Sequence, residues 1–232
     1  MRKYGVIIAA RTGSTRLPGK ALLPINDLPM IVFLIRRILN TRLAEKIVFA
    51  TTCLPEDDEL CAVVRREGIP IFRGADEDVV ERYVMAADAF DISFVVRITG
   101  DCPFVDSETL GYCLDQCNRM QRFDLATTKT LFPVGIDYEI YDASLLKRLH
   151  SGKLLDRSHR EHVTKYFYDY LDRFIVNKIK PKKVWKHKDA VFTVDTHRDY
   201  VFAQALSARF ESIHFSVDAL IKAAAEIQAD KR

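Results

Sequence analysis

The sequence predicts an α/β protein in which a mostly parallel mixed sheet lies between two layers of helices. Short apolar runs rich in β-branched residues, such as 6–10 and 47–50, alternate with longer segments whose apolar residues recur at helical spacing. Parallel strands need a crossover connection, usually a helix, so this repeated alternation favours parallel pairing. Ligands of such sheets bind beyond the carboxyl ends of the strands.

The first half of the chain predicts regular alternation. Strands are expected at 6–10, 46–52, 69–72, 93–98 and 124–128. Helices are expected at 29–42, 56–67, 77–90 and 107–120. Pro29 suits the first turn of its helix, and Gly68 directly follows the end of another. These elements form the expected body of the sheet.

The second half is less regular. We expect segment 132–157 to be an irregular appendage or a dimer arm, with a half-exposed strand near 136–141 in which Asp137 and Glu139 share one face. A helix is expected from Ser158, its N-cap, with Glu161 completing a capping box. A strand ending at Asp195 and two helices, 200–210 and 216–229, complete the chain.

Composition is typical of one domain in a reducing compartment. The chain has 232 residues, 48% of them hydrophobic, which is enough for one sizeable core. Its five cysteines are odd in number, and a chain of this length needs no disulfides to fold. A net charge of only +3 disfavours a dedicated nucleic-acid partner, and no apolar run is long enough for a membrane span. We therefore expect a cytoplasmic protein.

The loop after the first strand has the residues of a phosphate-binding site. The strand end and the loop supply the candidate contacts Ala9, Ala10, Arg11, Gly13, Ser14, Arg16 and Lys20. Glycines let the backbone approach an anion, and the cations give charge-assisted hydrogen bonds to phosphate oxygens. Their spacing fits neither the P-loop nor the dinucleotide fingerprint. A solvated turn is the alternative, and the loop alone does not decide between them.

Two aspartates follow other predicted strands. Asp101 comes directly after the strand that carries Arg97, a candidate for nucleotide or sugar contacts, and Asp195 ends a later strand. Two carboxylates at one edge of a sheet suit Mg²⁺, which prefers one or two carboxylates together with phosphate oxygens. The alternative is that Asp101 caps a helix or faces water, and that Asp195 or Thr196 is an N-cap.

Residues 10–20, Ala-Arg-Thr-Gly-Ser-Thr-Arg-Leu-Pro-Gly-Lys, followed by Pro29 and Met30, resemble the amino-terminal signature of the CMP-sugar synthetases. These cytidylyltransferases activate 3-deoxy-manno-octulosonate and sialic-type nonulosonates. The second half is more similar to the spore-coat polysaccharide branch, whose Gly-Leu-Asp-Val-Glu-Val segment stands here as 135–140 and whose Glu-Arg-Glu-His-Val-Thr-Pro-Tyr run stands as 159–166. The branch's Val-Asp-Thr-Pro-Glu-Asp is present with His197 and Arg198 replacing Pro and Glu.

The resemblance implies one Rossmann-like nucleotidyltransferase domain of the GT-A-like type over residues 1–232, and a homodimer. It implies transfer of CMP from CTP to an acidic 2-keto sugar, with release of pyrophosphate, for cell-surface polysaccharide biosynthesis. It implies that Arg11, Arg16 and Lys20 stabilise the charge that develops during catalysis, and that Asp101 and Asp195 bind Mg²⁺. Contacts with the sugar fall to Asp137, Glu139, Arg160 and His162.

Two other functions stay open. A nucleotidyltransferase that joins another nucleoside triphosphate to a sugar 1-phosphate would keep the loop without needing a carboxylate grip from Arg160. A non-catalytic nucleotide- or nucleic-acid-binding module would use the cationic run 178–188, in which six lysines surround Trp185. For this run we favour a surface hairpin around Pro181 with solvated lysines at a sheet edge, because the rest of the chain is balanced in charge.

Overall fold

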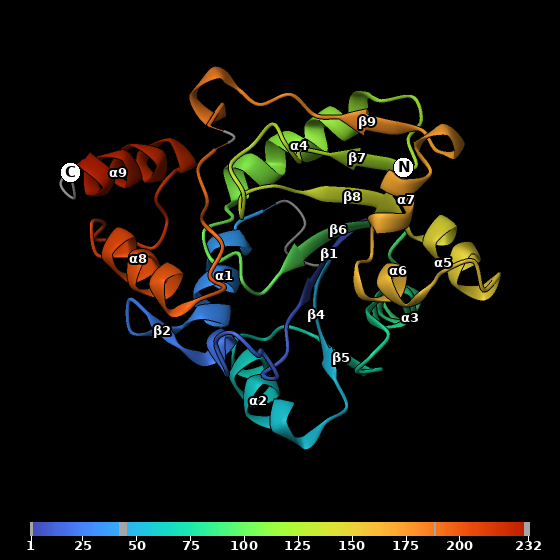
Figure 1. The fold of residues 1–232 in the computed structure, drawn as a ribbon, viewed down its shortest axis with the longest axis horizontal. Helices are drawn as coiled ribbons and strands as arrows, with labels where there is room; N and C mark the ends of the chain where they lie inside the picture. Colours follow the sequence, from blue (N-terminus) through green and yellow to red (C-terminus); the bar gives the residue numbers. More distant parts are fainter. Residues whose placement is uncertain (1, 42–45, 188, 230–232) are drawn as a thin grey trace.

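Seven strands form one mixed sheet in the computed structural model, which describes residues 2–41, 46–187 and 189–229 (Figure 1). The strand order is β5-β4-β1-β6-β8-β7-β9. Four neighbours are parallel, namely β5 (Ile71–Gly74), β4 (Ile47–Thr52), β1 (Tyr4–Ala9) and β6 (Phe94–Thr99). Strand β8 (Glu139–Asp142) runs antiparallel to β6 and to β7 (Leu125–Thr127), and β9 (Val176–Lys178) pairs parallel with β7. The predicted mostly parallel mixed sheet is confirmed.

Helices cover both faces of the sheet and enclose a separate apolar core on each (Figure 1). Successive side chains of a strand point to opposite faces, so Val6 and Ile8 enter one core and Ile7 enters the other. The first core is covered by α1 (Met30–Ile38), α2 (Asp58–Arg66), α4 (Ser107–Arg119), α8 (His197–Ser207) and α9 (Val217–Ala229). The second is covered by α3 (Val79–Ala89), α5 (Ala143–Ser151), α6 (Arg157–Glu161) and α7 (Lys165–Asp169). The chain thus has the three predicted layers.

Short elements complete the described chain. A small hairpin of β2 (Pro24–Ile25) and β3 (Leu28–Pro29) leads into α1, which ends before the predicted limit; that limit, Arg42, lies outside the described residues. Short 3₁₀ turns occupy Lys20–Leu22, Pro55–Asp57, Leu171–Arg173 and Lys183–Trp185. In the described part of the chain, no helix combines the length and apolar character needed to cross a membrane.

Segment 132–157 was expected to be an irregular appendage or a dimer arm with a half-exposed strand near 136–141, and the structure contradicts the irregular appendage. It contains β8, an interior strand of the sheet, and α5. The expected half-exposed strand is instead covered on both faces, with Ile140 in one core and Tyr141 in the other. The acidic residue Glu139 made the strand look solvent-facing in the sequence, but its side chain is buried together with its partners. A dimer contact from this segment stays a prediction.

The expected helix at 158–167 is two helices. Helix α6 is capped by Asp156, with His159 completing the box, so the predicted roles of Ser158 and Glu161 are wrong. An Asp side chain is at least as good an N-cap acceptor as Ser, and Asp156 stands two residues earlier. The chain leaves helical geometry at His162 (φ −110°, ψ 83°) before α7 begins.

Two expectations about the last third of the chain are also wrong. No strand ends at Asp195; in residues 190–194 Val191 forms an isolated bridge with Val134. The run 178–188 is not a hairpin around Pro181, because β9 is a parallel edge strand followed by the 3₁₀ turn at Lys183–Trp185. The last lysine of this run, Lys188, lies outside the described residues.

Candidate active site

A cleft of about 470 Å³ opens where β1 and β6 end. These strands are parallel neighbours with Ala9 opposite Thr99, so the loops that follow them begin side by side. The cleft is lined by most of the residues predicted from the sequence: Ala9, Ala10, Arg11, Gly13, Ser14, Arg16, Lys20, Arg97, Asp101, His162 and Asp195. Residues far apart in the chain therefore meet where an α/β sheet is expected to bind its ligand.

Gly100 allows the two loops to approach. Its backbone N–H donates to the carbonyl oxygen of Ala9 at 2.8 Å. A Cβ atom at this position would lie 2.5 Å from the Cβ of Ala10, closer than real Cβ atoms come to another atom. Only glycine fits, and the loop of Asp101 therefore starts in contact with the loop after β1.

The buried carboxylate of Asp57 anchors the loop after β1 (residues 10–20) to the body of the protein. Its Oδ1 accepts hydrogen bonds from the backbone N–H (2.8 Å) and hydroxyl (2.7 Å) of Thr12, and its Oδ2 accepts from the hydroxyls of Thr51 and Thr52. Burial alone would raise the pKa of Asp57, but these hydrogen bonds outweigh it and hold the pKa below its ordinary value. Sequence reasoning missed this residue, because an acid in the first turn of a helix resembles any other.

Lys20 joins the two predicted metal-binding aspartates. Its Nζ lies 3.2 Å from Asp101 Oδ2 and 2.9 Å from Asp195 Oδ1, and Arg16 reaches the same Asp195 oxygen at 3.0 Å. The backbone N–H of Val194 donates to the carbonyl oxygen of Asp101 at 2.8 Å, which fixes the two segments together. Asp101 and Asp195 thus converge on one cationic centre, although only Asp101 follows a strand.

The chemistry of these two carboxylates fits Mg²⁺. Mg²⁺ accepts one or two carboxylates when substrate phosphates complete its shell, so the residues present fit the ion. Within the described ranges, no group of three or more acidic, His or Cys side chains gathers into an all-protein metal site. Burial alone would raise the pKa of Asp101, but Lys20 and hydrogen bonds outweigh it and hold that pKa below its ordinary value. Asp101 is therefore ionised at neutral pH.

Arg82, which sequence reasoning missed, also lines the cleft. It is 3% exposed, donates from Nη1 to the carbonyl oxygen of Ala75 at 2.9 Å, and has no partner for Nε. Within the described chain, no carboxylate forms an ion pair with it. The equally buried Arg37 instead donates to four backbone carbonyl oxygens. The sequence does contain a sign that Arg82 is buried: on α3 it stands at helical spacing between the apolar residues Val79 and Ala86.

The structure does not bring Glu139 into the cleft. Its side chain is 2% exposed and its oxygens contact Arg97 (2.9 Å), Lys129 (3.0 Å), the hydroxyl of Thr164 (2.7 Å) and that of Tyr168 (2.8 Å). Burial alone would raise the pKa of Glu139, but Arg97 and Lys129 outweigh it and lower the pKa below its ordinary value. A carboxylate with four partners has little capacity left for sugar hydroxyls.

Asp137 and Arg160 are likewise engaged elsewhere. Asp137 accepts the backbone N–H of Gly135 at 2.8 Å and faces a void of about 30 Å³, which is far smaller than a sugar ring. Arg160 pairs with Asp78 and lies 3.4 Å from His150 Nδ1, outside the lining of the cleft. Of the four predicted sugar contacts, His162 alone lines the cleft.

A side pocket of about 240 Å³ adjoins the cleft. Its lining comprises Arg97, Lys129, His162, Thr164, Lys165 and Tyr168. Arg97 and His162 also line the cleft, so the two spaces share a wall. Its three cationic side chains outnumber the two carboxylates that pair with them, Glu139 (with Arg97 and Lys129) and Asp169 (with Lys165), so the pocket keeps a net positive charge that favours an anion. Sequence reasoning missed Lys129 and Tyr168, but Lys165 was visible as the residue that replaces the usual Pro of the related motif.

Comparisons with known proteins agree with this geometry. Residues 5–217 match the family described as cytidylyltransferase. The spore coat polysaccharide biosynthesis protein SpsF of Bacillus subtilis is 33% identical over 207 residues, which cover 86% of this chain and 84% of that protein. A 3-deoxy-manno-octulosonate cytidylyltransferase of Methylococcus capsulatus is 31% identical over 157 residues, covering 65% of this chain and 58% of that protein.

A solved structure extends the likeness to the whole fold. A cytidylyltransferase from Leptospira borgpetersenii superimposes with a TM-score of 0.92 at 31% identity, covering 99% of this chain and 96% of that one. The family match spans nearly the whole described sheet and both loops of the cleft. The chain therefore belongs to the cytidylyltransferase family.

Proposed function

We propose that this cytidylyltransferase activates an acidic 2-keto sugar. The anomeric hydroxyl oxygen of the sugar attacks the α-phosphorus of CTP; a new P–O bond forms as the bond to the β-phosphate oxygen breaks, and pyrophosphate leaves. The hydroxyl proton passes to solvent. The similarity to an enzyme named for 3-deoxy-manno-octulosonate supports an acceptor of this class.

The cationic side pocket is the observation that carries this proposal. Arg97, Lys129 and Lys165 surround a space that is too small for a nucleotide but suited to the carboxylate end of a sugar. Because Arg97 and His162 line both spaces, a sugar held by its carboxylate in the pocket would extend toward the cleft. Buried Glu139 acts here as a positioning residue that holds Arg97 and Lys129 in place.

The cations of the cleft bind and stabilise the phosphate chain. Arg16 and Lys20 stand at the two aspartates, and Arg11, paired with Asp76 at 2.7 Å, extends the row. Arg82 offers its unpartnered Nε–H, and a buried guanidinium without a carboxylate is best compensated by an anionic ligand. Fixed donors of this kind stabilise the charge that develops on the leaving pyrophosphate.

Asp101 and Asp195 would hold Mg²⁺ with the nucleotide. When bound, Mg²⁺ polarises the phosphate and lowers the pKa of a nearby hydroxyl. Lys20 keeps both carboxylates aimed at one centre before the nucleotide arrives.

A pyrophosphate-release screen tests the proposal. Each of the four ribonucleoside triphosphates is combined with 3-deoxy-manno-octulosonate, N-acetylneuraminate, their neutral ketose counterparts and several sugar 1-phosphates, with Mg²⁺ or with EDTA. We expect turnover with CTP, an acidic keto sugar and Mg²⁺ only. Turnover of a sugar 1-phosphate with silence for every acidic keto sugar would overturn the acceptor class, and full activity in EDTA would overturn the metal.

A further inference from the structure

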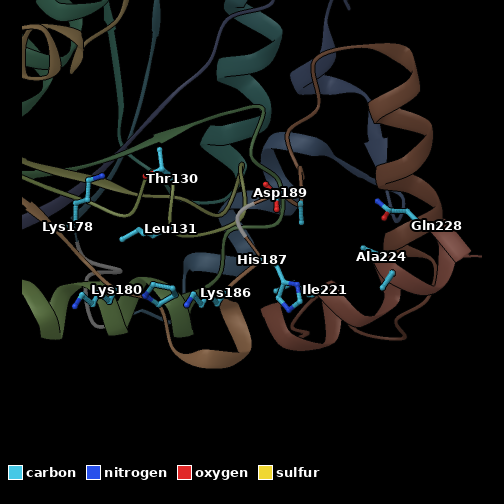
Figure 2. A pocket seen from close by; sticks show the side chains of 13 residues that line it. Thr130, Leu131, Lys178, Lys180, Lys186, His187, Asp189, Ile221, Ala224 and Gln228 are labelled. Carbon is cyan, nitrogen blue, oxygen red and sulfur yellow. The ribbon is translucent and has the colours of Figure 1, made fainter.

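A second cavity, which we call the α9 cavity, shares no lining residue with the cleft or the side pocket. It encloses about 880 Å³ between the loop after β7, the segment after β9 and helix α9. Figure 2 shows Lys178 at the end of β9 and two lysines of the following segment, Lys180 and Lys186, across from Ala224 and Gln228 of α9. Its volume is within the range of sites that take small organic ligands.

The floor of the α9 cavity is apolar. Ile221 and Ala224 of α9, 7% and 6% exposed, and the partly buried Leu131 form part of the lining. Pro181 and Ala190 add further carbon surface. Covering such surface with an apolar body is favourable by about 25 cal/mol per Å².

The rim of the α9 cavity is cationic and uncompensated. Lys178, Lys180 and Lys186 are exposed, and across the described residues none of them has a carboxylate partner. Lys182 of the same run behaves differently, because it pairs with Glu108 at 3.1 Å and points away from this lining. Asp189 is the lone acid among the lining residues that the structure describes. The rim therefore attracts anions.

The same geometry disfavours single-stranded nucleic acid as the partner of this run. Stacking of bases needs an exposed aromatic platform. Trp185 is 1% exposed, packed edge-on against Tyr112 and tilted against Phe132, with Lys182 over its ring at 4.4 Å. A concave apolar floor instead suits a compact ligand.

We propose that the α9 cavity binds a small amphiphilic anion, one acidic group on an aromatic or aliphatic body. The body covers Ile221, Ala224 and Leu131, and the acidic group meets Lys178, Lys180 and Lys186. This inference is independent of the acceptor sugar. The competing explanation is that these lysines only keep the β9 edge from pairing with other chains, in which case no ligand binds.

Two fluorescent probes with nearly the same body test the proposal in the full chain. 1-Anilinonaphthalene-8-sulfonate carries a sulfonate, and N-phenyl-1-naphthylamine lacks it. We expect saturable binding of one sulfonate probe per chain, at least about tenfold tighter than the neutral probe, and no displacement by saturating CTP. Equal binding of both probes, or displacement by CTP, would overturn the proposal.

Substitutions then locate the probe. The triple variant Lys178→Gln, Lys180→Gln, Lys186→Gln should weaken sulfonate binding about tenfold, and Ala224→Trp, which fills the floor, should abolish it. Lys183→Gln is the matched control, since Lys183 is an exposed lysine of the same segment that does not line the cavity. Unchanged binding in the triple variant, whose surface changes spare the core, refutes the site even if Ala224→Trp fails to fold.

Discussion

Replacement of Glu139 by Gln separates a positioning role from a sugar contact. The substitution keeps the shape of the side chain and removes its charge, leaving Arg97 and Lys129 without the carboxylate that they contact at 2.9 and 3.0 Å. If Glu139 only accepted sugar hydroxyls, the loss would appear in the KM for the sugar and leave stability unchanged. The contacts in the structure predict a loss in both.

The size of the stability loss follows from burial. Removing one partner of a fully buried ion pair costs about 3–5 kcal/mol. Because the side chains of Arg97 and Lys129 are 24% and 41% exposed, water screens part of this, and we expect about 2–3 kcal/mol. For a chain of this size, that lowers Tm by roughly 4–12 °C.

Thermal unfolding followed by circular dichroism, together with KM for sugar and CTP, decides the matter. Glu108→Gln is the control, because Glu108 forms an exposed pair with Lys182 and its loss should cost less than about 1 kcal/mol. We expect Glu139→Gln to lower Tm and raise the KM for the sugar more than that for CTP. A Tm equal to that of the unmodified protein would refute the positioning role.

Three further predictions concern the cleft and pH. Asp101→Asn and Asp195→Asn should each lower turnover by about a hundredfold or more in the pyrophosphate-release assay while the variants still fold; full activity in either variant removes that residue from the metal site. Arg82→Gln should raise the Kd for CTP about tenfold to a hundredfold in calorimetry and leave that for cytidine unchanged, whereas equal losses for both ligands would place Arg82 at the base. Because the folded pKa of Glu139 is lowered, its stabilisation is fully present above the unfolded pKa of about 4.3 and is lost as pH falls through the folded value. The Tm difference between the original protein and Glu139→Gln should therefore be constant near neutral pH and shrink below about pH 4; a difference that grows in acid contradicts the assignment.

Local patterns were sufficient for the parallel half of the fold. The first four strands of the sheet and their helices were predictable because a buried strand and an amphipathic helix each leave a short-range signature. The positions of the loop after β1 and of Asp101 beside the cleft were predictable for the same reason, as both directly follow such strands. The meeting of Asp101 with Asp195 was expected, but the backbone hydrogen bond from Val194 that links their segments is not visible in the sequence.

In the antiparallel half, the short strand β7 was predicted at 124–128, but the burial of β8 depended on contacts between distant segments. Alternation in 136–141 suggested a half-exposed strand, yet Glu139 is buried because Arg97, Lys129 and the α7 region supply its partners. Arg82 was not predicted as a site residue, because the sequence pattern shows it only as one position of a helix. In the structure it is a buried cation beside the cleft. Such polar burial depends on partners from several elements, which local patterns do not identify.

The triangle of Lys20, Asp101 and Asp195 has a consequence for which anions the resting protein accepts. A bare phosphate that recruits the Lys20 ammonium leaves Asp101 without its counter-charge and Asp195 with Arg16 alone, which is unfavourable. An anion that arrives already complexed to a divalent cation leaves neither carboxylate uncompensated. We therefore expect the ligand-free protein to bind free inorganic phosphate weakly and to favour anions that are already complexed to a divalent cation.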